Sequence, residues 1–224
     1  MKFAEHLMTL ALFAMLGACA SAPEVVKKPV EAVQQVVTTA VAAVTPAEAP
    51  VNPQAQAAFD AARAHLRAGR VAEAERGFRD VSARYPELGG AHANLGLILR
   101  NAGKHDESIA ALEQAVKASP KQAVFHNQLG VSYRHKGQFQ KARNAYEQAI
   151  ALDDNYADAH LNLGVLLDLY LGDSALALTH YERYLALSPA GDPAVGKWVA
   201  DLKNRKPASV AQADVKLTKK DGAR

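Results

Sequence analysis

A period of 34 residues runs through the centre of the sequence and constrains the fold more than any other feature. Each unit contains a helix-compatible run, a glycine, a second helix-compatible run and a turn. A unit of two short helices cannot bury its apolar face alone, so neighbouring units must stack and share one continuous core. The sequence therefore predicts an array of stacked helix pairs. The four expected units are residues 55–88, 89–122, 123–156 and 157–191.

Small and bulky residues recur at fixed places in these units. The eighth residue is small, which would let the two helices of a pair cross closely. In the second run, a small residue is followed four residues later by a bulky one, one helical turn further along the same face. The recurring residues are Ala62, Gly96, Gly130 and Gly164 at the eighth place, Gly69, Gly103, Gly137 and Gly172 at the turn, Ala74, Ser108, Ala142 and Ala177 in the second run, and Phe78, Leu112, Tyr146 and Tyr181 after them.

This pattern resembles the tetratricopeptide repeat (TPR) over roughly three fifths of the chain. The resemblance implies an all-α fold, namely a right-handed α-solenoid of four TPR helix pairs whose first helices line a concave surface. Two departures affect its ends. Ala58, Ala61 and Ala62 predict looser packing in the first unit. Tyr184 replaces an alanine of earlier units, which predicts that the last helix of the array meets the segment that follows it.

An amphipathic stretch follows the repeats at residues 192–205 and begins with Asp192 and Pro193, a typical helix start. Terminal repeats need a cap that covers their open face. We therefore expect a C-terminal capping helix, with Trp198 packed against the fourth unit rather than stacked on a ligand. The apolar residues at helical spacing are Val195, Trp198, Val199 and Leu202.

The N-terminus has the features of an export signal over residues 1–18. Its ten-residue apolar run, Leu7–Leu16, is too short to cross a bilayer, which takes about 20 residues. The run Leu16-Gly17-Ala18-Cys19 resembles the lipobox of bacterial lipoproteins, which implies acylation of Cys19 and anchoring in a membrane of the cell envelope. Ala20 stands where lipoproteins retained in the inner membrane carry Asp, so the outer membrane, facing the periplasm, is favoured. The alternative is that Cys19 is merely a small apolar residue of the signal.

Two segments outside the repeats lack periodicity. Residues 19–54, which begin with the lipidated cysteine, are rich in Ala, Pro and Val and are expected to form a tether. The second segment is the tail, residues 206–224. The C-terminal region from Lys203 onward, which includes this tail, has a net charge of +5, whereas the net charge of the whole chain is only +3. That small total argues against nucleic-acid binding. The tail is either a solvated end or a weak contact for anionic envelope polymers and lipid headgroups.

No motif indicates an enzyme or a cofactor. The sequence has no Gly-rich phosphate loop, no G-x-S-x-G and no H-E-x-x-H, and its single cysteine excludes a disulfide framework. His92, His126 and His160 recur every 34 residues. Equivalent places on stacked helix pairs lie about 10 Å apart, whereas metal ligands must lie within about 2.1 Å of the same ion. We therefore expect these histidines to be packing residues rather than a metal site.

The resemblance also implies a peptide-binding groove on the concave surface. In related repeats, an Asn at the sixth place hydrogen-bonds the backbone of an extended peptide, which makes Asn94 and Asn162 the best candidates. Arginines on the same surface favour an acidic peptide or a C-terminal carboxylate, although the full Lys/Asn pattern of chaperone-tail clamps is absent. Alternatively, these polar residues only solvate an exposed face. The implied groove residues are Asn94, Asn127, Gln128, Asn162, Arg63, Arg67, Arg100 and Arg134.

These features together predict a lipid-anchored TPR adaptor that binds a protein or peptide partner in its groove. Such a protein is similar to envelope TPR lipoproteins that assist assembly of secretin or pilus machines, or that scaffold cell-wall enzymes. The alternative function is a structural tether, in which the lipid holds one end of the chain and the basic tail binds cell wall or lipopolysaccharide.

Overall fold

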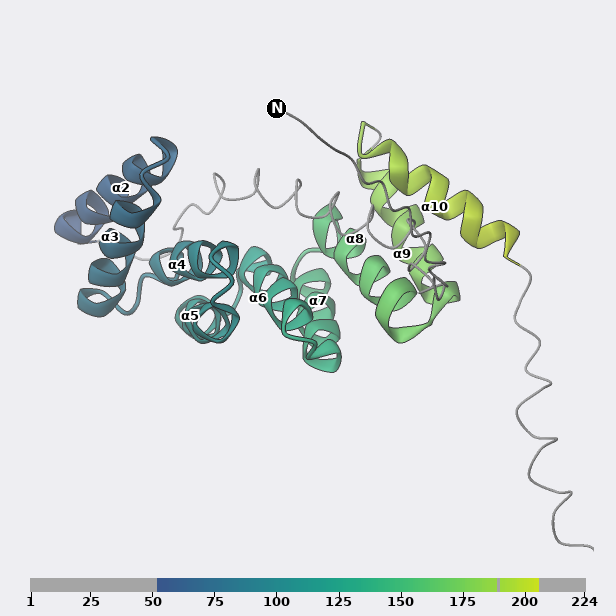
Figure 1. Ribbon diagram of the computed structural model, residues 1–224, viewed down its shortest axis with the longest axis horizontal. Coiled ribbons are helices and arrows are strands. Elements are labelled where there is room, and N and C mark those ends of the chain that lie inside the picture. Colours follow the sequence, from purple (N-terminus) through teal and green to yellow (C-terminus); the bar gives the residue numbers. More distant parts are fainter. Residues whose placement is uncertain (1–51, 189, 206–224) are drawn as a thin grey trace, which may run out of the picture.

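The computed structural model describes residues 52–188 and 190–205, and this part of the chain is helical without strands. Figure 1 shows the helices following one another pair by pair, from α2 and α3 at one end to α10 at the other. No helix among the described residues is long and apolar enough to cross a membrane. The helices are α2 (Pro53–Arg67), α3 (Val71–Arg84), α4 (Gly89–Asn101), α5 (His105–Ala118), α6 (Ala123–His135), α7 (Phe139–Leu152), α8 (Ala157–Leu166) with the π-helix η2 (Leu167–Leu171), α9 (Ser174–Leu187) and α10 (Pro193–Asn204).

Four helix pairs build the array: α2 with α3, α4 with α5, α6 with α7, and α8 with α9. The second helix of each pair also contacts the first helix of the next pair. In addition, the first helices of successive pairs touch each other, α4 with α6 and α6 with α8. Each pair therefore meets only its neighbours, which is the property of a solenoid. The predicted all-α solenoid of four helix pairs with a C-terminal helix is confirmed.

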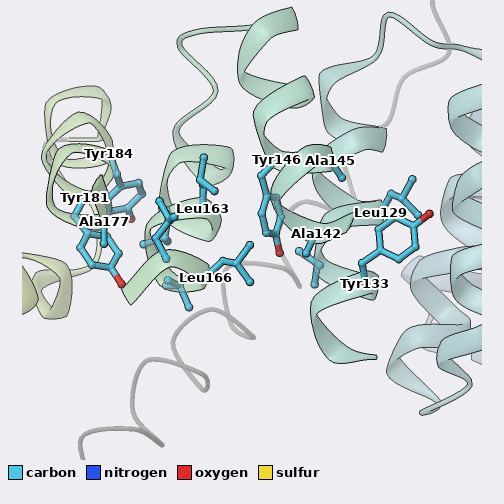
Figure 2. Close-up of a cluster of buried hydrophobic side chains, with 14 of the residues drawn as sticks. Leu129, Tyr133, Ala142, Ala145, Tyr146, Leu163, Leu166, Ala177, Tyr181 and Tyr184 are labelled. Atoms are coloured by element: carbon cyan, nitrogen blue, oxygen red, sulfur yellow. The ribbon is translucent and has the colours of Figure 1, made fainter. Parts of the chain in front are cut away.

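The helices of a pair cross closely at the glycine of the first helix. A Cβ atom on Gly130 would lie 2.6 Å from ring carbons of Tyr146, and one on Gly164 would lie 2.7 Å from the ring of Tyr181. Both tyrosines are buried, and Figure 2 shows them within part of a cluster of apolar side chains that extends from α4 to α10. The glycines therefore make room for the aromatic rings, as the repeated pattern predicts.

The first pair achieves the same close crossing in a different way. Phe59 and Phe78 are buried and meet edge to face, with ring centroids 5.7 Å apart. A Cβ atom on Gly77 would lie 2.9 Å from the Cβ of Ala62. The glycine of this pair thus lies on the second helix instead of the first. The expectation of loose packing around Ala58, Ala61 and Ala62 was wrong, because Gly77 compensates for the larger residue at the eighth place.

The extra residue of the fourth unit lies inside a helix. The turn glycines of the first three units adopt left-handed backbone angles with φ between 72° and 76°, and Gly172 has φ 72° as well. Between α8 and Gly172, the chain forms the π-helix η2, whose wider turn accommodates an inserted residue. The turn into α9 therefore keeps the geometry of the earlier units despite the insertion.

Helix α10 caps the array. Trp198 packs against Tyr181 with ring centroids 5.6 Å apart, and the backbone N–H of Asp192 donates to the hydroxyl of Tyr184 at 3.2 Å. The ion pair of Arg205 with Asp168, at 3.1 Å, joins the end of α10 to η2. The predicted contacts of Trp198 and Tyr184 are confirmed. The predicted signal, the predicted lipidation site Cys19, the tether up to residue 51 and the tail 206–224 lie outside the described residues.

Candidate functional site

The first helices of the pairs form one surface, which we call the inner face and define by α2, α4, α6 and α8. Helices α4, α6 and α8 are deeply packed, since each lies against its partner and against a neighbouring pair, whereas α2 contacts chiefly α3. In α4, only His92 and Asn101 are not buried. The polar side chains of α4, α6 and α8 are therefore placed in a largely dehydrated setting, where each hydrogen bond or unpaired charge matters more than it would in water.

A chain of amide hydrogen bonds crosses the inner face between α6 and α8. Asn162 Nδ2 donates to Asn127 Oδ1 at 3.0 Å, and Asn127 Nδ2 donates to the hydroxyl of Tyr156 at 3.2 Å. Asn162 Oδ1 is buried and has no hydrogen-bond partner among the described residues. The chain of donors and acceptors therefore ends in a buried acceptor without a partner in this part of the chain, and a peptide N–H would reach it only after neighbouring side chains move aside.

Asn94 differs from Asn162 although both occupy the sixth place of their units. Its Nδ2 donates to the carbonyl oxygen of Gly90 in the same helix at 2.7 Å, and the residue is only 1% exposed. One donor of this amide is therefore already occupied by the backbone of α4. Peptide binding by Asn94 stays a prediction, and the amide oxygen of Asn162 is buried but has no partner among the described residues.

Two arginines of the inner face are buried. Arg100 is 5% exposed and Arg134 is 7% exposed. Arg100 Nη1 donates to the backbone carbonyl of Gln128 at 3.2 Å. Arg100 Nη2, Arg134 Nη1 and Gln128 Oε1 are buried and have no hydrogen-bond partner among the described residues. Such groups are rare in folded proteins and call for an explanation.

Burial also shifts the ionisation of this cluster. The pKa of Arg100 falls to about 10, chiefly because burial disfavours its charged form and also because Arg134 is positive, while Tyr146 opposes the shift. Burial raises the pKa of the Tyr146 hydroxyl, against the influence of both arginines. At neutral pH, the cluster therefore contains two guanidinium cations and a neutral hydroxyl, and the oxygen of that hydroxyl is buried without a partner among the described residues.

The arginines of α2 are not part of this cluster. Arg63 lies 3.8 Å from the carboxylate of Asp60 and 5.6 Å above the ring centroid of Phe59. Arg67 is exposed near the end of the helix. The inner face therefore combines an exposed basic end at α2 with a buried basic centre at α4 and α6.

The periodic histidines fasten the loops that connect the repeats. Each Nε2 lies within hydrogen-bond distance of a backbone carbonyl six residues earlier, and a carbonyl only accepts, so the ring must donate from Nε2. No group of three or more His, Cys, Asp or Glu side chains within residues 52–188 and 190–205 could hold a metal ion. The hydrogen bonds are His92 to Pro86 at 3.1 Å, His126 to Pro120 at 2.8 Å and His160 to Asp154 at 3.1 Å.

Reasoning from the sequence missed two members of the site. Tyr156, which accepts from Asn127, lies just before a unit at a place where Leu88 and Gln122 stand in earlier units, so no periodic signal marks it. Tyr146 was recognised only as a bulky packing residue. The equivalent residue of the preceding unit, Leu112, fills the same space without a polar atom. Packing alone therefore does not require the hydroxyl of Tyr146, and this difference was a signal in the sequence.

Comparison with known proteins agrees with this architecture. Family models described as "Tetratricopeptide repeat" and "TPR repeat" match residues 59–123 and 132–169. No curated protein sequence matches the chain. Solved structures with a similar fold include the MamA protein (23% identity, 66% of this chain, 80% of that chain, TM-score 0.60), Pseudomonas aeruginosa pilF (21%, 66%, 67%, 0.60) and a thermophilic TPR protein of Thermus thermophilus (23%, 80%, 98%, 0.55). At these identities the likeness shows a shared fold.

Proposed function

We propose that this chain, built from tetratricopeptide repeats, is a lipid-anchored adaptor that binds a protein or peptide partner on its inner face. In this role it supports the assembly or scaffolding of a complex in the bacterial cell envelope. Stacked repeats form extended surfaces suited to binding other proteins. The proposal gives the chain no catalytic step, because an adaptor acts by holding its partners near one another.

The unpartnered acceptor at the end of the amide chain, the buried Oδ1 of Asn162, carries this proposal. Buried polar atoms in folded proteins nearly always have partners, and Asn162 Oδ1 has none among the described residues. An extended peptide offers one backbone N–H per residue and can satisfy such an acceptor whatever its side chains are. Recognition of backbone in this way suits an adaptor that binds a segment lacking regular structure.

The membrane part of the proposal is supported by the sequence alone. The lipobox-like run ending at Cys19 supports acylation, and Ala20 supports the outer membrane with the repeats facing the periplasm. Several acyl chains hold a protein stably, whereas a single chain binds only weakly. Replacement of Cys19 by Ser should release the protein into the soluble periplasmic fraction or leave an uncleaved precursor. Membrane retention of a processed Cys19→Ser variant would contradict lipid anchoring.

Partner capture tests the adaptor role. After crosslinking in cells, we expect a specific protein to be recovered with the wild-type chain and to be lost with Asn162→Ala. The matched control is Asn144→Ala, which changes an exposed Asn of α7, outside the inner face, and should retain the partner. Circular dichroism melting of both variants shows whether the repeats remain folded. Equal recovery with the wild-type chain and a folded Asn162→Ala variant would contradict binding on the inner face.

The charge of the C-terminal region favours a second candidate, the structural tether. The chain carries +5 from Lys203 onward, and each basic residue near an anionic surface contributes about 1 kcal/mol of attraction. Deletion of residues 206–224 should then abolish sedimentation with purified cell wall or lipopolysaccharide while leaving partner capture unchanged. If the deletion affects neither, the tether is excluded and the tail is a solvated end.

A further inference from the structure

Helix α2 carries an exposed face that the later units bury. We call it the uncovered face and define it by Ala57, Ala61 and Ala64, all of which are exposed. The equivalent residues of the later units are at most 7% exposed. In α4, they belong to one buried cluster with Phe78 and Val81 of the preceding helix α3. The uncovered face is therefore the place where a preceding second helix would pack. The equivalent residues are Ala91, Leu95 and Ile98 in α4, Phe125, Leu129 and Ser132 in α6, and Ala159, Leu163 and Leu166 in α8.

The two ends of the array are finished differently (Figure 1). At the C-terminal end, α10 packs on α9 and buries its apolar residues Val195, Val199 and Leu202. At the N-terminal end, α2 contacts chiefly α3 among the described residues. An end repeat needs a cap on its apolar face. A cap for α2 must supply bulky side chains, because α2 offers alanine at the places where α4 has Leu95 and Ile98.

The sequence shortly before α2 contains a segment with such side chains, residues 31–44, which lies outside the described residues. The segment runs between Pro29 and Pro46 and has no Pro or Gly of its own. As a helix it would be about 21 Å long, close to the length of α2. A helix this short is not stable alone in water, so packing on another helix decides whether it forms. Its valines share one helical face: Val33, Val37, Val41 and Val44.

The chain between this segment and α2 is long enough for the segment to fold back. In the later units, four residues suffice to join a second helix to the first helix of the next unit, namely 85–88, 119–122 and 153–156. Residues 45–52 connect the segment to α2, which begins at Pro53. This connection is longer than those in the array. An antiparallel arrangement on the uncovered face is therefore within reach.

Contacts between later units indicate which residues would meet. The first residue of a second helix packs on the thirteenth residue of the next unit, as His105 stacks on His135 with ring centroids 5.5 Å apart. Phe139 meets Tyr170 in the same way, displaced by the inserted residue. The thirteenth residue of the first unit is Arg67, which is exposed at the end of α2. Because the segment begins with Glu31, the docked arrangement would bring opposite charges together. Val37 would then lie opposite Ala61.

We propose that residues 31–44 form a helix that docks antiparallel on the uncovered face and caps the N-terminal end of the array. The valines fill the space that the alanines of α2 leave, and Glu31 pairs with Arg67. This docking does not depend on the partner of the proposed adaptor. It shortens the free chain between the proposed lipidation site, Cys19, and the folded part to residues 20–30, which span at most about 37 Å when extended. The repeats are then held close to their point of attachment.

Hydrogen exchange of the full chain, followed by mass spectrometry, tests the docking. We expect the amides of residues 31–44 to exchange at least about tenfold more slowly than in an isolated peptide of the same sequence. Ala61→Glu places a charge in the interface and should remove this protection. The matched control is Ala110→Glu, which changes an exposed alanine of α5 and should retain it. Exchange of the wild-type segment at the peptide rate, or unchanged protection in Ala61→Glu, would overturn the proposal.

A substitution in the segment itself separates docking from folding of the repeats. Val37→Asp leaves every described residue unchanged, so α6 and α7 should keep their protection from exchange. The amides of residues 31–44 should lose theirs, because a carboxylate would face Ala61. If Ala61→Glu unfolds the first pair, Val37→Asp alone decides the question. Retained protection of the segment in Val37→Asp would show that it does not lie on α2.

Disulfide formation tests which chain covers the face. The sequence has one cysteine, so in a Cys19→Ser background the introduced cysteines are the only thiols. We expect Val37→Cys with Ala61→Cys to form a disulfide within one chain under mild oxidation, whereas Val37→Cys with Ala110→Cys should stay reduced. Non-reducing gels separate a bridged monomer from a bridged dimer. A disulfide between two chains, together with a dimer in sedimentation, would show that a second copy covers the face and would overturn the proposal.

Discussion

The close crossing of α6 and α7 predicts that the smallest possible enlargement of Gly130 destabilises the array. In Gly130→Ala, the new methyl group would lie 2.6 Å from two ring carbons of Tyr146, about 1 Å closer than carbon atoms normally approach. Tyr146 is completely buried, so its ring cannot swing into solvent. Relief requires the two helices to move apart.

The size of the effect follows from two opposing contributions. Overpacking a buried site costs up to about 3 kcal/mol, and alanine favours a helix over glycine by about 1 kcal/mol. We therefore expect a net loss of about 2 kcal/mol. For a folded region of this size, such a loss lowers the melting temperature by about 4–8 °C.

Gly196→Ala is the matched control, because it makes the same substitution in α10 where nothing lies within 4 Å of the new methyl group. Only the helix preference acts there, so the melting temperature should stay the same or rise. Thermal melts followed by circular dichroism compare the two variants with the wild-type chain. If Gly130→Ala melts at or above the wild-type temperature, the reasoning from close crossing is refuted.

Three further predictions concern pH, backbone and the cap. Burial lowers the pKa of His180, and the neighbouring His160 adds to the shift; the unfolded chain therefore binds more protons, and stability should fall as the pH drops below about 6.5. Melting temperatures between pH 7.5 and 5.5 should fall less in His180→Gln, and an equal fall would contradict the shift. Gly137→Ala should lower the free energy of unfolding, measured by chemical denaturation, by about 1 kcal/mol. Nothing lies within 4 Å of the new methyl group, so the loss comes from the left-handed backbone with φ 76°. An unchanged free energy of unfolding would show that the turn relaxes. Trp198→Ala should expose α10 to hydrogen exchange, at a cost of about 2 kcal/mol from the lost contact with Tyr181; unchanged protection would exclude this contact as the cap's anchor.

The sequence predicts the helix pairs because spacing along the chain reports which residues share a helix face. The sequence could not predict how the first pair packs. Comparison of the eighth residues shows that Ala62 replaces the glycine of later units, and it does not show what the partner helix places opposite Ala62. The residue that compensates, Gly77, lies on the partner helix and matters only once the two helices are set against each other. A larger residue on one helix can always be offset by a smaller one on the other.

The sequence predicts which residues belong to the candidate site, but it does not predict the hydrogen bonds that these residues form. The sixth-place rule treats Asn94 and Asn162 alike, yet one amide donates to its own helix and the other to Asn127. Arg100 and Arg134 were expected on an open, solvated surface, and both are buried. The difference arises because α4 and α6 each pack against their partner helix and against both neighbouring pairs, and this depends on how tightly the whole array packs.

The π-helix η2 has a consequence for how long this array can be. Its Asp168 pairs with Arg205 of the cap, and the ring of its Tyr170 packs at a tilt against Phe139 of the preceding pair, with ring centroids 4.7 Å apart. A duplicated third unit inserted before α8 would meet the same surfaces that exist now. A unit appended after α9 would find those surfaces occupied by α10. A unit added after α9 would therefore have to displace α10, whereas a unit inserted in the middle of the array would leave the cap in place.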